Sequence, residues 1–292
     1  MSVPLEILEW QRPWLTPLEP ILRTCLTGSL TQGVVRHDWR DRFNAMATEQ
    51  GLSNHRGAPL HFVQQSALPP QVAYEAFIST TGGVPTRDNL HDFFNGLVWL
   101  TFPKSKAALN AIQAIEIERS VASPTAGAPS EPSPPRETNL LNSKHSNKST
   151  RGMLRDRATI FDENGALVLT CDTALAQALV EHRWQEALLL RRADFGVVCE
   201  VTLFGHALME KLVRPYKAIT AHVWVLQVDR LFFDLTCQAK RQAIDTLLCR
   251  HLEQGMLAVP AAHLPVLGVP HWWKDQNEIF YADTSVFRPK RT

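Results

Sequence analysis

The sequence lacks the cysteine pattern of a disulfide-rich or zinc-knuckle protein. Its cysteines number five, an odd count, and no two of them form a Cys-x-x-Cys pair. This argues against a disulfide framework and predicts reduced thiols. Residues 1–14 also lack the basic start and long apolar core of a secretory signal. Together these absences predict a cytoplasmic protein.

The sequence has no excess of charge of one sign. Its 30 Lys and Arg residues nearly balance 29 Asp and Glu residues, for a formal net charge of +1. The whole molecule therefore gives no strong nucleic-acid signal, although a local basic patch is left open. No run of about 18 uncharged apolar residues is present, which excludes a membrane-spanning helix. With 45% hydrophobic and 20% charged residues, the composition is that of a globular protein, and no partner is identified.

The common catalytic motifs are absent as well. There is no GxxxxGK[ST] phosphate loop, no GxGxxG turn, no GxSxG elbow, no HExxH pair and no kinase signature. These absences disfavour ordinary nucleotide-binding folds, α/β-hydrolases and zincins. The sequence therefore does not disclose a reaction, and whether the protein is an enzyme stays open.

One segment differs from the rest in composition. Residues 120–150 hold five prolines, many Ser and Thr, and only two adjacent leucines. Such a stretch cannot bury enough apolar surface to offset its ordering entropy, so we expect a disordered insertion. We predict one domain made of a helical part at 1–119 and an α+β part at 151–292.

Hydrophobic periodicity predicts the elements on both sides of this insertion. Helical spacing occurs at 18–30, 39–50, 104–119 and 238–253, and 197–203 and 221–228 read as strands. Residues 158–170 (ATIFDENGALVLT) predict a β-hairpin that turns at Asn164-Gly165. The expected fold is a helix-rich α+β domain with a β-hairpin or small sheet.

The densest polar cluster occupies the start of an expected helix and contains His91, Asp92 and Asn95. His91 and Asn95 lie one turn apart on one helical face, with Arg87 near it. A histidine beside carboxylate and amide groups can shuttle protons or bind a metal, because its pKa lies near neutrality. The alternative is structural: a helix cap and buried hydrogen bonds. We take His91, Asp92 and Asn95 as candidate catalytic residues.

A second constellation pairs His206 with Glu210, one turn apart on an otherwise apolar helix. This spacing is used by metal sites, and it also occurs in ordinary side-chain pairs. We take the two residues as candidate ligands of a divalent metal; the sequence indicates no other cofactor. Asp156 is a further catalytic candidate, because it opens an expected strand where no turn requires a carboxylate. Asp162 and Glu163, in contrast, read as residues of the hairpin turn.

An aromatic run near the C-terminus contains Trp272 and Trp273. Adjacent residues of an extended segment point to opposite faces, so one of them can reach a ligand. Both are candidate binding residues together with Arg87, although dense aromatics also fill cores.

Five blocks carry a resemblance to a known family. They read VPTRDNLHDFFNGLVWLTFPKSKAALN, RDRATIFDENGALV, FGHALMEKL, LPVLGVPHWW and FYADTSVFRP. In these blocks the chain resembles an uncharacterised proteobacterial family, domain of unknown function 3025, from about Tyr74 to Pro289 without the insertion. The resemblance implies a bacterial, cytosolic, single-domain protein and supplies no catalytic residues.

Two classes of function follow from these residues. The first is a hydrolase-like enzyme that uses histidine and carboxylates, with or without a divalent metal. The second is a non-catalytic binding protein whose aromatic and basic surface recognises a small ligand, a nucleic acid or a protein. The enzyme requires the candidate polar residues to converge in one cleft.

Overall fold

The computed structural model describes residues 9–27, 39–122, 150–255, 257 and 260–290. Apart from its ends, the expected insertion at 120–150 lies outside these residues. The α-helices are α1 Glu19–Thr27, α2 Trp39–Glu49, α3 Tyr74–Thr81, α4 Leu90–Thr101, α5 Pro103–Ala122, α6 Thr150–Asn164, α7 Thr173–Val180, α8 His206–Lys211, α9 Cys237–Glu253 and α10 Glu278–Ala282. The strands are β1 His61–Gln64, β2 Gly83–Thr86, β3 Gly165–Thr170, β4 Cys199–Leu203, β5 Thr220–Gln227 and β6 Ala262–Pro265.

The strands form two small sheets. The larger has the order β4-β3-β5-β6; β3 runs antiparallel to β4 and parallel to β5, and β6 is antiparallel to β5. All of β3 is buried, in keeping with its uninterrupted apolar sequence. The smaller sheet pairs β1 with β2 in parallel, joined through α3. The fold is therefore α+β with helices predominating, as expected.

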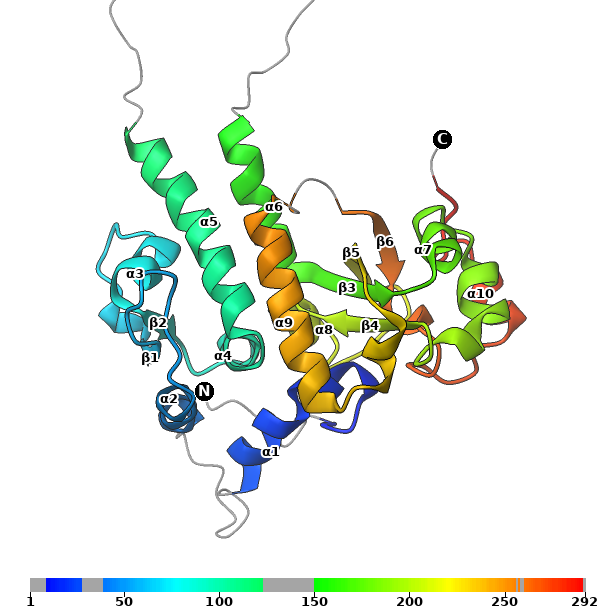
Figure 1. The fold of residues 1–292 in the computed structure, drawn as a ribbon, viewed down its shortest axis with the longest axis horizontal. Coiled ribbons are helices and arrows are strands. Elements are labelled where there is room, and N and C mark those ends of the chain that lie inside the picture. The colour runs from blue at the N-terminus through cyan, green and yellow to red at the C-terminus, as the bar shows by residue number, and fades with distance from the viewer. Residues whose placement is uncertain (1–8, 28–38, 123–149, 256, 258–259, 291–292) are drawn as a thin grey trace, which may run out of the picture.

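Long helices occupy the space between the two sheets (Figure 1). Helix α5 packs against both α6 and α9, and α4 packs against α8. The helices expected at 39–50, 104–119 and 238–253 are confirmed as α2, α5 and α9. No helix within the described ranges is long and apolar enough to cross a membrane.

The predicted hairpin at 158–170 is wrong. Its first arm, up to Asn164 of the expected turn, is the C-terminal half of α6, and only the second arm, from Gly165 on, is a strand, β3. Leu154, Ala158 and Phe161 follow helical spacing, and all three pack into the core from one face. Neither Asn164 nor Gly165 has the positive φ that a tight hairpin turn needs. Here Asn-Gly joins a helix to a strand.

Aromatic packing connects the parts of the chain on either side of residues 123–149. The ring of Phe204 stacks on Phe102 at 5.9 Å and on Phe161 at 4.6 Å between centroids. Because Phe102 belongs to the N-terminal part, the core is shared. We propose on this basis that the chain is one domain.

This proposal predicts that two fragments, 1–122 and 150–292, associate when they are expressed together. Each fragment alone would expose the apolar faces that α5 and α6 bury against each other, and this surface drives association. Pull-down through a tag on one fragment, followed by size-exclusion chromatography, measures the complex. Two fragments that each fold alone and elute separately would instead show two domains.

Candidate functional site

The start of α4 is locked in place by polar contacts. The Oδ1 of Asn89 accepts from the backbone N–H of Asp92 at 2.7 Å and caps the helix. The Asp92 carboxylate in turn accepts from the backbone N–H of Arg87 at 2.6 Å and from its guanidinium. These contacts fix the first turn of α4, from which His91 projects.

Two glycines bring α6 and α8 together on the other side of the site. The N–H of Gly205 donates to the carbonyl of Gly165 at 2.8 Å. A Cβ atom on Gly205 would lie 2.5 Å from the Gly165 nitrogen and 2.6 Å from the Glu163 carbonyl oxygen. Only glycine permits this approach. Because Gly205 immediately precedes α8, the contact places His206 beside Glu163.

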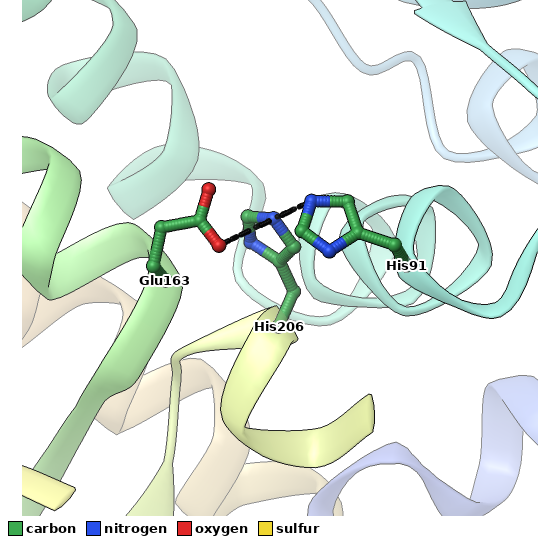
Figure 2. Close-up of side chains that lie close together, drawn as sticks. All are labelled: His91, Glu163 and His206. Atoms are coloured by element: carbon green, nitrogen blue, oxygen red, sulfur yellow. Dashed lines mark hydrogen bonds and ion pairs between the residues drawn. The ribbon is translucent and has the colours of Figure 1, made fainter. Parts of the chain in front are cut away.

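His91, Glu163 and His206 converge from α4, α6 and α8 (Figure 2). The two histidine Nε2 atoms lie 3.0 Å apart. Glu163 Oε2 lies 3.6 Å from the Nε2 of His206 and 4.0 Å from that of His91. A point about 2.1 Å from all three atoms exists, since that is the radius of the circle through them, and Zn–N and Zn–O bonds have this length. The three atoms therefore fit the first coordination shell of one metal ion.

The hydrogen bonds of His91 determine which nitrogen faces this point. Its Nδ1 lies 3.1 Å from Glu210 Oε2, and an ionised carboxylate can only accept. Nδ1 therefore carries a proton, and in the tautomer with this proton alone the Nε2 presents its lone pair to His206. A carboxylate on the far nitrogen of a metal-binding histidine is a common arrangement, because it fixes the tautomer and the ring orientation.

His206 is suited to the same role. Its ring is buried, and burial lowers its pKa to about 4 despite the nearby Asp162, so the ring is neutral at pH 7. Its Nδ1 has no hydrogen-bond partner within the described part of the chain, and Asp162 Oδ2 lies 3.9 Å away. A proton on Nδ1 faces a carboxylate and leaves the Nε2 lone pair directed at His91. A metal ion between the two Nε2 atoms would accept both lone pairs; without one, a proton on either Nε2 makes an N–H···N hydrogen bond over the same 3.0 Å.

Behind the histidines lies a buried ion pair. The Nζ of Lys106 on α5 donates to Asp162 Oδ1 at 2.5 Å and to Asn95 Oδ1 at 2.9 Å. Burial alone would raise the pKa of Asp162, but the charge of Lys106 and its hydrogen bond outweigh it and keep the pKa below its usual value. This pair holds the end of α6 against α4 and α5.

The two histidines, Glu163, Asp162 and Asn95 line a cleft of about 340 Å³. Its walls come from the loop before α3 and from α3, α4, α5, α6 and α8. Among its residues, Glu75 is an acid whose pKa burial raises to about 7. The lining residues are Gln65, Leu68, Ala73, Tyr74, Glu75, Arg87, His91, Asp92, Asn95, Gln113, Ile117, Arg155, Thr159, Asp162, Glu163 and His206.

The structure brings most of the candidate site residues together. Arg87, His91, Asp92, Asn95 and His206 all line the cleft. Glu210, expected to share a metal with His206, contacts His91 instead, and its place near His206 is taken by Glu163.

Three candidates lie elsewhere. Asp156, expected at the start of a strand, is on α6 and is exposed outside the cleft, because the predicted strand is a helix. Trp272 packs against the ring of Trp14 at 6.1 Å between centroids. Trp273 is partly buried against the core, and neither tryptophan lines the cleft. The structure thus separates the aromatic run from the histidine cluster.

The sequence analysis missed Glu163, Asp162, Lys106 and Tyr74. The first two were assigned to a turn, although the spacing of Leu154, Ala158 and Phe161 gave the signal for a helix. Lys106 repeats with Asn110 and Gln113 on one face of α5, and all three are buried. A polar stripe on a helix is usually solvated, so this signal did not identify a site.

One family model matches the chain. It is described as a protein of unknown function, DUF3025, and covers residues 60–131 and 135–291. No curated protein and no solved structure matches.

Proposed function

Because the chain belongs to DUF3025, a family of unknown function, we propose from the site alone that it is a hydrolase dependent on a divalent metal ion. The observation that carries this proposal is the triangle formed by His91 Nε2, His206 Nε2 and Glu163 Oε2. Two histidines and a glutamate are a ligand set of catalytic zinc, in which a further position holds water.

The surroundings of the triangle support hydrolysis. A bound ion lowers the pKa of its water and polarises a substrate oxygen. Glu210 orients His91, and the Lys106–Asp162 pair lies next to His206, so both histidine ligands have a carboxylate near the second ring nitrogen. The cleft admits a substrate to this position, and its polar walls offer donors to an oxygen that becomes negative.

Metal binding tests the proposal. We expect the purified protein to contain or bind close to one equivalent of zinc, measured by elemental analysis and by competition with a chromophoric chelator. Glu163→Gln and His206→Ala should each lower zinc affinity by at least about 100-fold, because each removes one of three ligands. Glu210→Gln should lower it by about tenfold or more through the orientation of His91.

Asp156→Asn is the matched control for Glu163→Gln, since both acids lie on α6 and Asp156 is outside the cleft. It should leave zinc affinity unchanged. The zinc-loaded protein is then screened with chromogenic phosphate, carboxylate and sulfate esters, before and after treatment with chelator. Absence of metal binding, or iron in place of zinc together with oxygen consumption, would contradict a metal-dependent hydrolase, because the same ligand types also hold Fe²⁺ in oxygenases.

A further inference from the structure

The polarity of one buried amide is fixed by its neighbour. An ammonium group can only donate, so the Asn95 atom that contacts Lys106 Nζ at 2.9 Å must be the carbonyl oxygen Oδ1. The amide nitrogen of Asn95 then points the other way and donates to the hydroxyl of Tyr74 at 3.0 Å. Lys106 thereby determines that Tyr74 is an acceptor toward Asn95.

It follows that the proton of the Tyr74 hydroxyl is directed elsewhere. Among the residues that the structure describes, Tyr74 has Asn95 as its hydrogen-bond partner and no acceptor for its own proton. The side chain lines the cleft. Burial and the nearby acids Glu75 and Asp92 raise the pKa of Tyr74 well above its usual value, so the hydroxyl keeps its proton. Tyr74 is therefore a neutral donor to whatever occupies the cleft.

Two guanidinium groups line the same cleft. Arg87 engages Asp92 through Nε and one terminal nitrogen, and its side chain is 59% exposed. The guanidinium group of Arg155, on α6, has no hydrogen bond or ion pair within the described part of the chain. Asp92 is paired with Arg87 and Asp162 with Lys106, and the charge of Arg155 acts on the buried Glu75. Glu75 is itself partly protonated near pH 7, because burial raises its pKa to about 7.

We propose that Tyr74, Arg87 and Arg155 form an anion-binding wall of the cleft, and that the substrate is a phosphate ester. Donors from three separate side chains suit a tetrahedral group with several oxygens better than a planar carboxylate, which one guanidinium fork satisfies. This proposal rests on the proposed function, because it names the substrate of the same site. A bound ion would polarise the ester group, and the wall would hold the remaining oxygens of that group.

Titration of the zinc-loaded protein with inorganic phosphate, monitored by isothermal calorimetry, tests the anion-binding wall. Arg155→Ala and Tyr74→Phe should each weaken phosphate binding by about tenfold, the effect of losing one hydrogen bond to a charged group. Arg157→Ala, two positions away on α6 and outside the cleft lining, should leave it unchanged. Zinc affinity of all three variants should match the parent protein, which separates loss of the wall from loss of the metal site. The melting temperature of Arg155→Ala and Arg157→Ala should also match, whereas Tyr74→Phe removes the acceptor of the buried Asn95 amide and should lower it.

Equal phosphate affinity in the parent and in Arg155→Ala and Tyr74→Phe would overturn the proposal, since the ion alone would then hold the anion. Acetate binding as tightly as phosphate would overturn the choice of a phosphate ester. If the parent protein binds no zinc, the proposed function fails, and the same titration of the metal-free protein decides the wall by itself. If the metal-free protein binds phosphate and loses this binding in Arg155→Ala and Tyr74→Phe, the anion-binding wall is supported. If the metal-free protein binds no phosphate, the wall is overturned.

Discussion

Replacement of Lys106 by methionine is expected to destabilise the protein by about 3 to 5 kcal/mol, the cost of leaving one charge of a buried ion pair without its partner. The side chains of Lys106 and Asp162 are 4% and 10% exposed and meet at 2.5 Å. Methionine has an unbranched side chain of similar length, so the loss of stability measures the contribution of the ammonium charge and its hydrogen bonds. Chemical denaturation monitored by circular dichroism measures the change in the free energy of unfolding.

Lys104→Met is the matched control, because Lys104 is exposed on the same helix and its ammonium group donates to the hydroxyl of Thr246. It should change stability by less than about 0.5 kcal/mol. The double variant Lys106→Met/Asp162→Asn should recover part of the loss, since it removes both charges. A single variant as stable as the parent would show that the pair is not coupled to folding.

The pH dependence of this difference has a defined sign. The pKa of Asp162 is lowered in the folded protein, so its contribution is present above the ordinary carboxyl pKa and is lost as the pH falls through the folded value. In Lys106→Met the ammonium charge that opposes the effect of burial is gone. The pKa of Asp162 in the folded variant should therefore rise above the ordinary carboxyl value. The variant is therefore stabilised by protonation of Asp162, and its deficit relative to the parent should shrink from pH 7 to pH 4.

Replacement of Gly205 by alanine is expected to lower zinc affinity by at least about tenfold and to destabilise the fold by about 1 to 3 kcal/mol or more, the cost of overpacking. The added Cβ would meet the backbone nitrogens of Gly165 and Asn164 at 2.5 and 2.6 Å. Backbone atoms cannot rotate away as a side chain can, so the start of α8 must move away from the end of α6. This motion separates His206 from Glu163.

Gly152→Ala provides the control, because a Cβ on Gly152 would meet nothing within 4 Å. In a helix, alanine is favoured over glycine by about 1 kcal/mol, so this variant should be as stable as the parent or more so. Unchanged zinc affinity and melting temperature in Gly205→Ala would show that the close contact of the two chain segments is not required for the site.

The local spacing of apolar residues was sufficient to predict a helix where that helix has one buried and one exposed face. Periodicity located α2, α5 and α9. It was also sufficient to place His91 and Asn95 on one face of α4 and to single out His206. Each of these inferences depends on residues within one or two turns of each other.

Inference from local pattern failed where long-range contacts decide the structure. Asn164-Gly165 has the chemistry of a hairpin turn, but the apolar face of α6 packs against the core and keeps the preceding residues helical. The partner of His206 was sought at the nearest acid along its helix, Glu210, whereas the fold supplies Glu163 from a different helix. Spacing along one helix cannot show which acid another helix brings close.

The proposed metal ligands come from parts of the chain that are distant in sequence. His91 and His206 are 115 positions apart, and Glu163 lies between them on a third helix. The unfolded chain holds these groups apart, and the entropy of closing a loop rises only with the logarithm of its length. An ion present at about 100 times its dissociation constant would add about 2.7 kcal/mol to the stability of the folded state. A bound ion would thus be a reversible cross-link of the tertiary structure, and its affinity would report how well the two ends of that loop are held together.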